Sequence, residues 1–239
     1  IVLSIVWGGS FFFIGLSAKE LPSFTIVFLR VGLASTILWL GLIWVGQKMP
    51  GDKAVWKMFF SIGLINNVIP FSLIVWGQHH ITSSLASILN ATTPFFTIVL
   101  VHFLTEEERI SKNRLLGLVI GFIGVSIIVG QDFVEGVGVG TWAQFAVLGA
   151  AFLYGVALVY GRKFHSMGIK PIIAATGQLT ASTLVLFPIV LLADSPWALT
   201  NPSGTTWAAI IGLGVLSTAF AFFLYYRLLA TAGAVNISL

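Results

Sequence analysis

Long apolar runs separated by short polar breaks make up nearly the whole chain. A helix that crosses the hydrocarbon core of a bilayer needs about 20 mostly apolar residues. Runs of this kind predict membrane spans at residues 1–17, 24–46, 56–78, 82–104, 114–131, 142–162, 171–193 and 206–229. A further span begins near residue 232. The pattern therefore predicts an all-α, polytopic membrane helix bundle.

The breaks between the runs carry residues that begin or end helices. Pro22 opens the second run, Pro171 opens the seventh, and a Pro-Gly-Asp segment at 50–52 separates the second from the third. Strands of a membrane barrel alternate apolar and polar residues, whereas these runs are apolar on every face. Each backbone must then satisfy its hydrogen bonds within its own segment, which favours helices.

Composition supports the same class of protein. The sequence is 57% hydrophobic and 8% charged, with a mean hydropathy of +1.01. An ordinary soluble domain carries about 25% charged residues. The chain contains no cysteine, so no disulfide framework is expected. The bilayer is the expected environment of this surface.

Basic residues concentrate in the loops on one side of the predicted membrane. They are Lys48, Lys53, Lys57, Arg109, Lys112, Arg114, Arg162, Lys163, Lys170 and Arg227. The loops on the other side hold Lys19 together with Asp132, Glu135 and Asp194. Cytoplasmic loops are enriched in lysine and arginine, so the basic side and the N-terminus are predicted to face the cytoplasm of a cytoplasmic membrane. Because this charge reports topology, nucleic acid is not an expected partner.

The two parts of the chain resemble each other at a shift of about 149 residues. The matches include Gly63-Leu64 with Gly212-Leu213, Pro22 with Pro171, and, at a shift of 147, Trp7-Gly8 with Tyr154-Gly155. We therefore expect two repeats, at residues 1–131 and 142–239. A unit of five spans is odd in number, so the second copy would be inverted, as in many secondary transporters. The run that begins at Ile1 and the one that ends at Leu239 are cut short, which indicates a fragment without the start of helix 1, most of helix 9 and helix 10.

Two asparagines precede prolines by four residues: Asn66 precedes Pro70, and Asn90 precedes Pro94. Proline has no N–H and clashes with the carbonyl four residues earlier. Each site is therefore a predicted kink or hinge that offers an amide side chain and a free carbonyl inside the membrane. Substrate binding and ordinary interhelical hydrogen bonding are both open readings of these asparagines.

Further candidates for substrate contact are one charged, one amide and several aromatic side chains. Arg30 lies inside the second span, where a charge is costly unless it is paired or reaches water. It is suited either to an anionic solute group or to a structural bond with a neighbouring helix. Gln178 occupies nearly the corresponding place in the seventh span. The aromatic candidates are Trp7, Trp76, Tyr154 and Tyr225, although aromatic residues also serve as interfacial anchors.

The sequence offers little for catalysis. All acidic residues lie outside the predicted spans or at their edges, which argues against a simple carboxylate proton relay. There is no HExxH or GxSxG motif. We therefore expect no enzyme activity, no cofactor and no metal.

Several segments resemble the EamA branch of the drug/metabolite transporter superfamily. They are WGGS at 7–10, FLR at 28–30, ASILNATTPFF at 86–96, ERIS at 108–111, and glycines at 117, 121 and 124. The resemblance implies ten helices in two inverted halves around a central cavity, and outward movement of metabolites such as amino acids. It also implies that Trp7, Arg30, Trp76, Asn90, Tyr154, Gln178 and Tyr225 lie near that cavity.

The expected function is secondary transport of a small amphipathic or amino-acid-like metabolite, with efflux as the direction. A sugar-phosphate or nucleotide-sugar carrier and a non-transporting membrane bundle are the alternatives. A homodimer is an open alternative for assembly.

Overall fold

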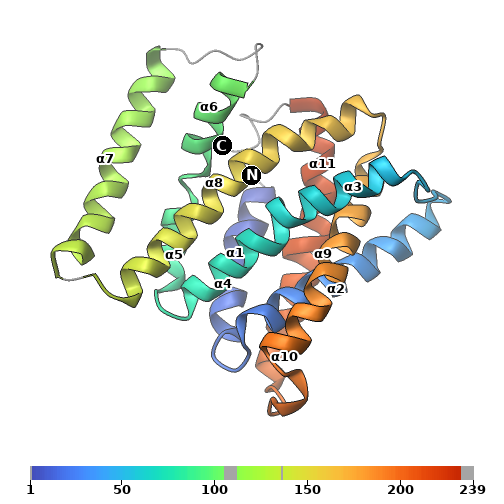
Figure 1. Ribbon diagram of the computed structural model, residues 1–239, viewed down its shortest axis with the longest axis horizontal. Coiled ribbons are helices and arrows are strands. Elements are labelled where there is room, and N and C mark those ends of the chain that lie inside the picture. Colours follow the sequence, from blue (N-terminus) through green and yellow to red (C-terminus); the bar gives the residue numbers. More distant parts are fainter. Residues whose placement is uncertain (1, 105–111, 136, 233–239) are drawn as a thin grey trace.

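A computed structural model describes residues 2–104, 112–135 and 137–232, and every regular element in these ranges is helical (Figure 1). The α-helices are α1 Val2–Ser17, α2 Ser23–Trp44, α3 Lys53–Gly63, α4 Ile69–Gln78, α5 Ser83–Asn90, α6 Thr93–Leu104, α7 Lys112–Glu135, α8 Val139–Ser166, α9 Pro171–Ala193, α10 Gly204–Gly214 and α11 Ala221–Ala232. Two π-helical segments, η1 Leu64–Val68 and η3 Val215–Phe220, and a 3-10 turn, η2 Pro196–Ala198, complete them.

These elements reproduce the predicted spans. Within the described ranges, 6 helical runs are long and apolar enough to cross a membrane. Three of them join several elements: α3-η1-α4, α5-α6 and α10-η3-α11. Helix α1 and the apolar part of α7, Leu116–Gly130, are shorter. The predicted all-α membrane bundle is therefore confirmed, and the span expected near residue 232 lies outside the described residues.

Polar residues cap the helix ends as the sequence suggests. The Asp52 side chain accepts the N–H of Ala54 at the start of α3. Helix α2 begins after Pro22 without a side-chain cap of its own. Asp194, at the end of α9, accepts the Thr25 N–H at 2.6 Å and the Thr25 hydroxyl at 2.8 Å. A carboxylate at a helix N-terminus is favourable, so α9 supplies the cap that α2 lacks.

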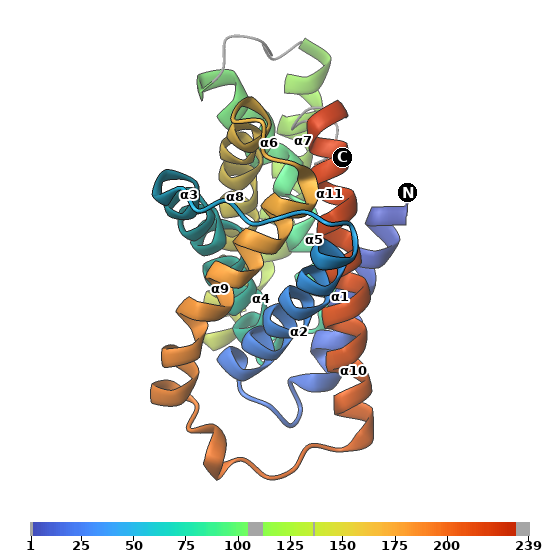
Figure 2. The same ribbon diagram turned by 90° about the vertical axis from the view of Figure 1, so that its right-hand side faces the viewer.

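Helices α2 and α9 run antiparallel and pack closely against each other (Figures 1 and 2). The Asp194 cap joins the start of α2 to the end of α9. Midway, the hydroxyls of Ser35 and Thr180 lie 3.0 Å apart. At the opposite end, Lys170 Nζ donates to Gln47 Oε1 at 2.8 Å. Three contacts spaced along both helices fix their register.

A second carboxylate, that of Glu20, joins two loops at the end of the bundle where Asp194 lies. Glu20, between α1 and α2, accepts the N–H of Ser203 at 2.7 Å. This hydrogen bond lowers the pKa of the Glu20 carboxyl, because it stabilises the charged form. Partial burial lowers the pKa of the nearby His79 imidazole. The loop before α2 is thus linked to the loop before α10.

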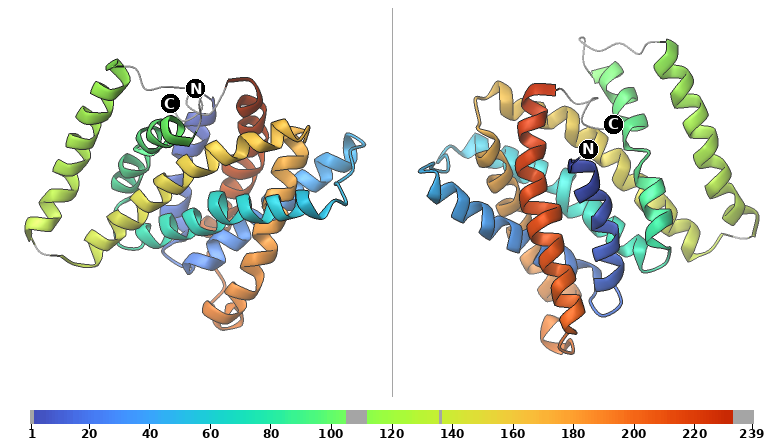
Figure 3. Two further views of the ribbon diagram at one scale, coloured as in Figure 1. Left: turned by 45° about the horizontal axis from the view of Figure 1, so that its top comes forward. Right: turned by 180° about the vertical axis from the view of Figure 1, so that it is seen from behind.

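The remaining helices pack around this pair. Helix α8 crosses α4 and α6, while α1 packs against α10 and lies beside α11 (Figure 3). Helix α7 lies at the edge of the bundle and exposes apolar side chains such as Ile120 and Ile127. Such a surface is normal for a helix that faces lipid.

Each predicted kink coincides with an interruption of the helix. Pro70 follows η1, in which the backbone widens to a π turn. Near Pro94 the chain breaks between α5 and α6. The expectation of a free carbonyl at Asn90 is wrong, because the Thr93 hydroxyl donates to that carbonyl at 2.8 Å. A hydroxyl three residues later replaces the N–H that proline lacks.

Candidate functional site

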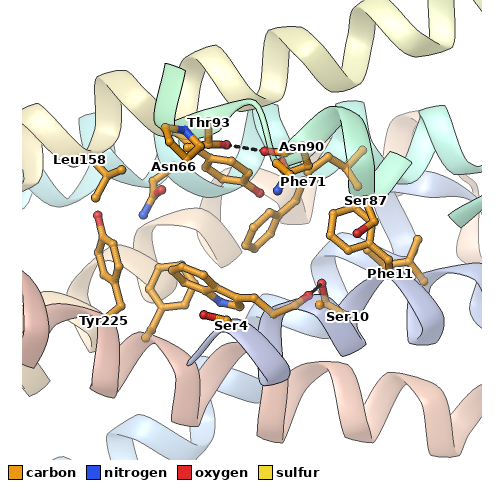
Figure 4. Close-up of a pocket in the computed structure, with 18 of the residues that line it drawn as sticks. Ser4, Ser10, Phe11, Asn66, Phe71, Ser87, Asn90, Thr93, Leu158 and Tyr225 are labelled. Carbon is orange, nitrogen blue, oxygen red and sulfur yellow. Dashed lines mark hydrogen bonds between the residues drawn. The ribbon is translucent and has the colours of Figure 1, made fainter. Parts of the chain in front are cut away.

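A cavity of about 310 Å³ lies inside the bundle, among α1, α2, η1, α4, α5, α6, α8 and α11 (Figure 4). Its polar lining residues are Ser4, Ser10, Arg30, Asn66, Ser87, Asn90 and Thr93. Its aromatic lining residues are Trp7, Phe11, Phe71, Tyr154, Phe222 and Tyr225. The volume suits a small organic molecule.

Aromatic rings form the wall between α1, α8 and α11. The Trp7 ring lies 5.7 Å from the Tyr225 ring and 6.5 Å from the Phe222 ring, measured between centroids. Phe71 lies edge-on to Tyr154 at 6.3 Å. Contacts of this geometry hold aromatic rings in place, so this wall is preformed for an apolar or aromatic group.

Arg30 is the charged residue among the described lining residues, and it is 4% exposed. Its Nε donates to Thr218 Oγ1 at 2.7 Å. Its Nη2 lies 3.5 Å from the Ser217 carbonyl oxygen. Its guanidinium carbon stacks 3.7 Å from the centroid of the Phe71 ring. Helix α2 supplies the cation, and η3 of the second half holds it.

Amide groups give the cavity neutral hydrogen-bonding capacity. The Asn66 side chain and the Tyr225 hydroxyl point into the same space (Figure 4). Asn90 Oδ1 is buried and has no hydrogen-bond partner. A buried acceptor without a partner is costly, so this atom is suited to a donor on a bound molecule.

The structure brings together seven of the predicted site residues around this one cavity. They are Trp7, Arg30, Asn66, Asn90, Pro94, Tyr154 and Tyr225. Trp76 lies elsewhere: it is 38% exposed and packs against His80. Pro70 is buried in α4, away from the lining. Gln178 is also buried away from it.

Gln178 belongs to a polar network that the sequence did not indicate. Its Nε2 donates to Asn67 Oδ1 at 3.0 Å, and its Oε1 accepts the Tyr226 hydroxyl. Asn67 Nδ2 in turn donates to Ser182 Oγ at 2.9 Å. All four side chains are buried. The network joins η1 and α11 to α9 beside the cavity.

In two pairs of adjacent residues, one residue lines the cavity and the other belongs to the network. Asn66 and Tyr225 line the cavity, whereas Asn67 and Tyr226 face the network. The doublets Asn-Asn and Tyr-Tyr were the available signal, because adjacent helical residues face different directions. No described group of three or more His, Asp or Glu residues is arranged to hold a metal ion.

A multi-pass helical bundle with a polar and aromatic cavity in its interior is the arrangement expected of a membrane transporter. A family model shows to which family of proteins the chain belongs. It matches residues 1–130 and 141–239, and the chain belongs to the EamA-like transporter family.

Individual relatives agree with this assignment. The chain is 23% identical to the uncharacterized transporter YoaV of Bacillus subtilis, over 96% of this chain and 77% of that protein. It is 26% identical to an uncharacterized transporter of Archaeoglobus fulgidus, over 98% of this chain and 80% of the relative. The uncharacterized inner membrane transporter YedA of Escherichia coli is 22% identical over 84% of this chain and 64% of its own length. These relatives support a membrane transporter.

A solved structure shares the fold. It superposes with a TM-score of 0.70 at 15% identity and covers 99% of this chain and 82% of the matched chain. At this identity the likeness concerns the fold alone.

Proposed function

We propose that the chain belongs to a secondary carrier that moves a small amphipathic or amino-acid-like solute by alternating access. The observation that carries this proposal is the cavity, because both parts of the chain line it. The aromatic wall accommodates the apolar part of the solute, and Asn66, Asn90 and Arg30 meet its polar groups.

The proposed mechanism is a rocking of two inverted halves, residues 1–131 and 142–239, around this cavity. Helices α2 and α9, which correspond in the repeat, run antiparallel. Helix α1 packs on the span α10-η3-α11, as its counterpart α8 packs on the span α3-η1-α4. The π segments η1 and η3 occupy corresponding places. Reciprocal packing of this kind supports inverted repeats, in which exchanging the two conformations opens the opposite side.

The Arg30 and Gln178 contacts support the same mechanism. Arg30 of α2 bonds to Thr218 in η3, and Gln178 of α9 bonds to Asn67 in η1. Each half of the chain is thus hydrogen-bonded to the π segment of the other half. In this conformation the Arg30–Thr218 contact borders the cavity, whereas the Gln178–Asn67 contact is buried away from it. We propose that the two exchange these roles during transport.

The proposal extends to placement, which rests on the basic loops, and to direction, which rests on the resemblance to the EamA branch alone. The protein resides in the cytoplasmic membrane with its basic loops and N-terminus on the cytoplasmic side, and it moves solute outward. A sugar-phosphate or nucleotide-sugar carrier is disfavoured, because among the described lining residues only Arg30 is cationic. Recognition of several phosphate charges requires more cations.

Asn90→Ala is expected to reduce transport efficiency about tenfold, because one hydrogen bond to the solute is lost. Unfolding should be nearly unaffected, since Asn90 Oδ1 has no partner in the protein. Initial uptake rates in vesicles, with the full-length protein and a panel of labelled solutes, measure the effect. Asn201→Ala, in an exposed loop, is the matched control. Equal transport by Asn90→Ala and wild type would remove Asn90 from the site.

A further inference from the structure

We infer that Arg30 is a specificity-determining residue that selects solutes bearing one carboxylate, and that Thr218 is the residue that positions it. The inference rests on the proposed function, and it deepens that function by naming the charge of the solute. Arg30 comes from the first half of the chain and Thr218 from the second.

The Arg30 guanidinium is held but not neutralised. Two of its five N–H groups have protein acceptors, the Thr218 hydroxyl and the more distant Ser217 carbonyl. No acidic side chain in the described part of the chain contacts it, and acidic residues are absent from the described cavity lining. A buried cation inside a membrane is costly without a partner, so an anionic ligand would supply the missing charge.

Thr218 determines which edge of the guanidinium stays available. Its hydroxyl donates to the Leu213 carbonyl at 2.8 Å, which leaves an oxygen lone pair to accept Arg30 Nε at 2.7 Å. Because Nε is occupied, side-on pairing through Nε is blocked. The Phe71 ring covers one face of the group. The end-on edge formed by Nη1 and Nη2 remains, and it matches the two oxygens of a carboxylate.

Neighbouring contacts fix η3 itself. The Ser217 hydroxyl donates to the Val6 carbonyl of α1 at 2.9 Å. Val6 precedes Trp7, whose ring lines the cavity. The segment that holds Arg30 is therefore also bonded to the helix that carries the aromatic wall.

Charge balance favours a carboxylate over a phosphate ester. One carboxylate neutralises Arg30 and leaves the cavity uncharged. A phosphate ester carries a charge of roughly −1.5 to −2 near neutral pH, so it would leave excess negative charge among neutral side chains. The unpartnered Asn90 Oδ1 accepts a hydrogen bond from an uncharged amide or hydroxyl group on the same solute. The predicted ligand thus combines one carboxylate with one hydrogen-bond donor.

The test compares probes of similar shape and different charge on the full-length protein. The probes are 3-phenylpropanoate, 3-phenylpropanamide and 2-phenylethyl phosphate, with L-leucine and L-leucinamide as a second pair. Binding is measured by ligand-dependent shifts in melting temperature, and uptake is measured in vesicles. Wild type should bind each carboxylate at least about tenfold more tightly than its amide, and should not prefer the phosphate.

Variants separate recognition from folding. Arg30→Gln should abolish the preference for carboxylate over amide. Thr218→Val should weaken carboxylate binding about tenfold and leave amide binding unchanged, and Thr218→Ser should restore it. Thr176→Val is the control, because Thr176 is equally buried and its hydroxyl bonds within its own helix to Ile172. If Arg30→Gln does not fold, the comparison of Thr218→Val with Thr218→Ser tests the inference by itself.

The outcomes distinguish this inference from the proposed function. Equal affinity of wild type for carboxylates and amides, with transport intact, would overturn the inference alone. A Thr218→Val variant that weakens both classes equally would overturn the positioning role. Failure of folded wild type to bind or transport any probe, and any solute of the wider panel, would overturn both.

Discussion

Asn67→Leu is expected to lower the free energy of unfolding by about 2–4 kcal/mol and to abolish transport. Asn67 is fully buried, donates to Ser182 and accepts from Gln178. Leucine has a similar size but offers neither a donor nor an acceptor. The substitution leaves the amide of Gln178 without its acceptor, and burying a polar group without a partner is costly. The contact that joins η1 to α9 is lost as well.

Asn66→Leu is the matched control, since it makes the same change one residue earlier. The Asn66 side chain lines the cavity. Asn66→Leu should therefore lower transport while leaving the melting temperature of the protein near that of wild type. Thermal unfolding in detergent micelles and vesicle uptake measure the two effects. Equal destabilisation by both substitutions would contradict the division between network and cavity.

Gly155→Leu is expected to prevent correct packing of α8 on α6 and to eliminate most of the folded protein. A Cβ atom at Gly155 would lie 3.1 Å from the Thr97 backbone nitrogen and 3.3 Å from the Phe96 carbonyl carbon. Backbone atoms of a packed helix cannot move aside as a flexible side chain does, so the whole of α6 must shift. Both helices carry cavity residues, Tyr154 on α8 and Pro94 on α6, and the cavity would lose its shape.

The size series at Gly155 gives the control. Gly155→Ala should have a milder effect than Gly155→Leu, because a single methyl group requires a shift of a few tenths of an ångström. Gly124→Leu should fold normally, since nothing lies within 4 Å of a Cβ at that position on exposed α7. Size-exclusion profiles and melting temperatures compare the variants. Normal folding of Gly155→Leu would show that α6 and α8 are not closely packed there.

The hydropathy pattern was sufficient for the fold class, because membrane spans depend on length and apolar content rather than on fine packing. The prolines at 70 and 94 also marked the interruptions of their helices. Hydropathy does not tell which face of a helix points inward. Trp76 and Gln178 illustrate this limit, since one is partly exposed and the other is sealed in a network.

The partners of Arg30 were harder to predict from sequence. Thr218 lies in a π segment, where the widened turn departs from the regular helical period. No residue pattern in the chain predicted the π segment η3. Phe71 and Phe222 were missed for another reason, because phenylalanine in a membrane helix most often faces lipid or the core. Long-range contacts, rather than local sequence, place Thr218 against Arg30 and bring the two phenylalanines to the cavity.

The central claim is that a water-accessible chamber lies between two halves that open it alternately. The chain has no cysteine, so Asn90→Cys gives a single reactive site in a full-length protein in which any cysteine outside these 239 residues has been replaced by serine. We predict that a membrane-impermeant thiol reagent labels it, and that a transported solute shifts the rates from the two sides of the membrane in opposite directions. Leu89→Cys, at a fully buried neighbour, should stay unlabelled. An Asn90→Cys variant that reacts from neither side, or from one side alone with and without solute, would contradict the account.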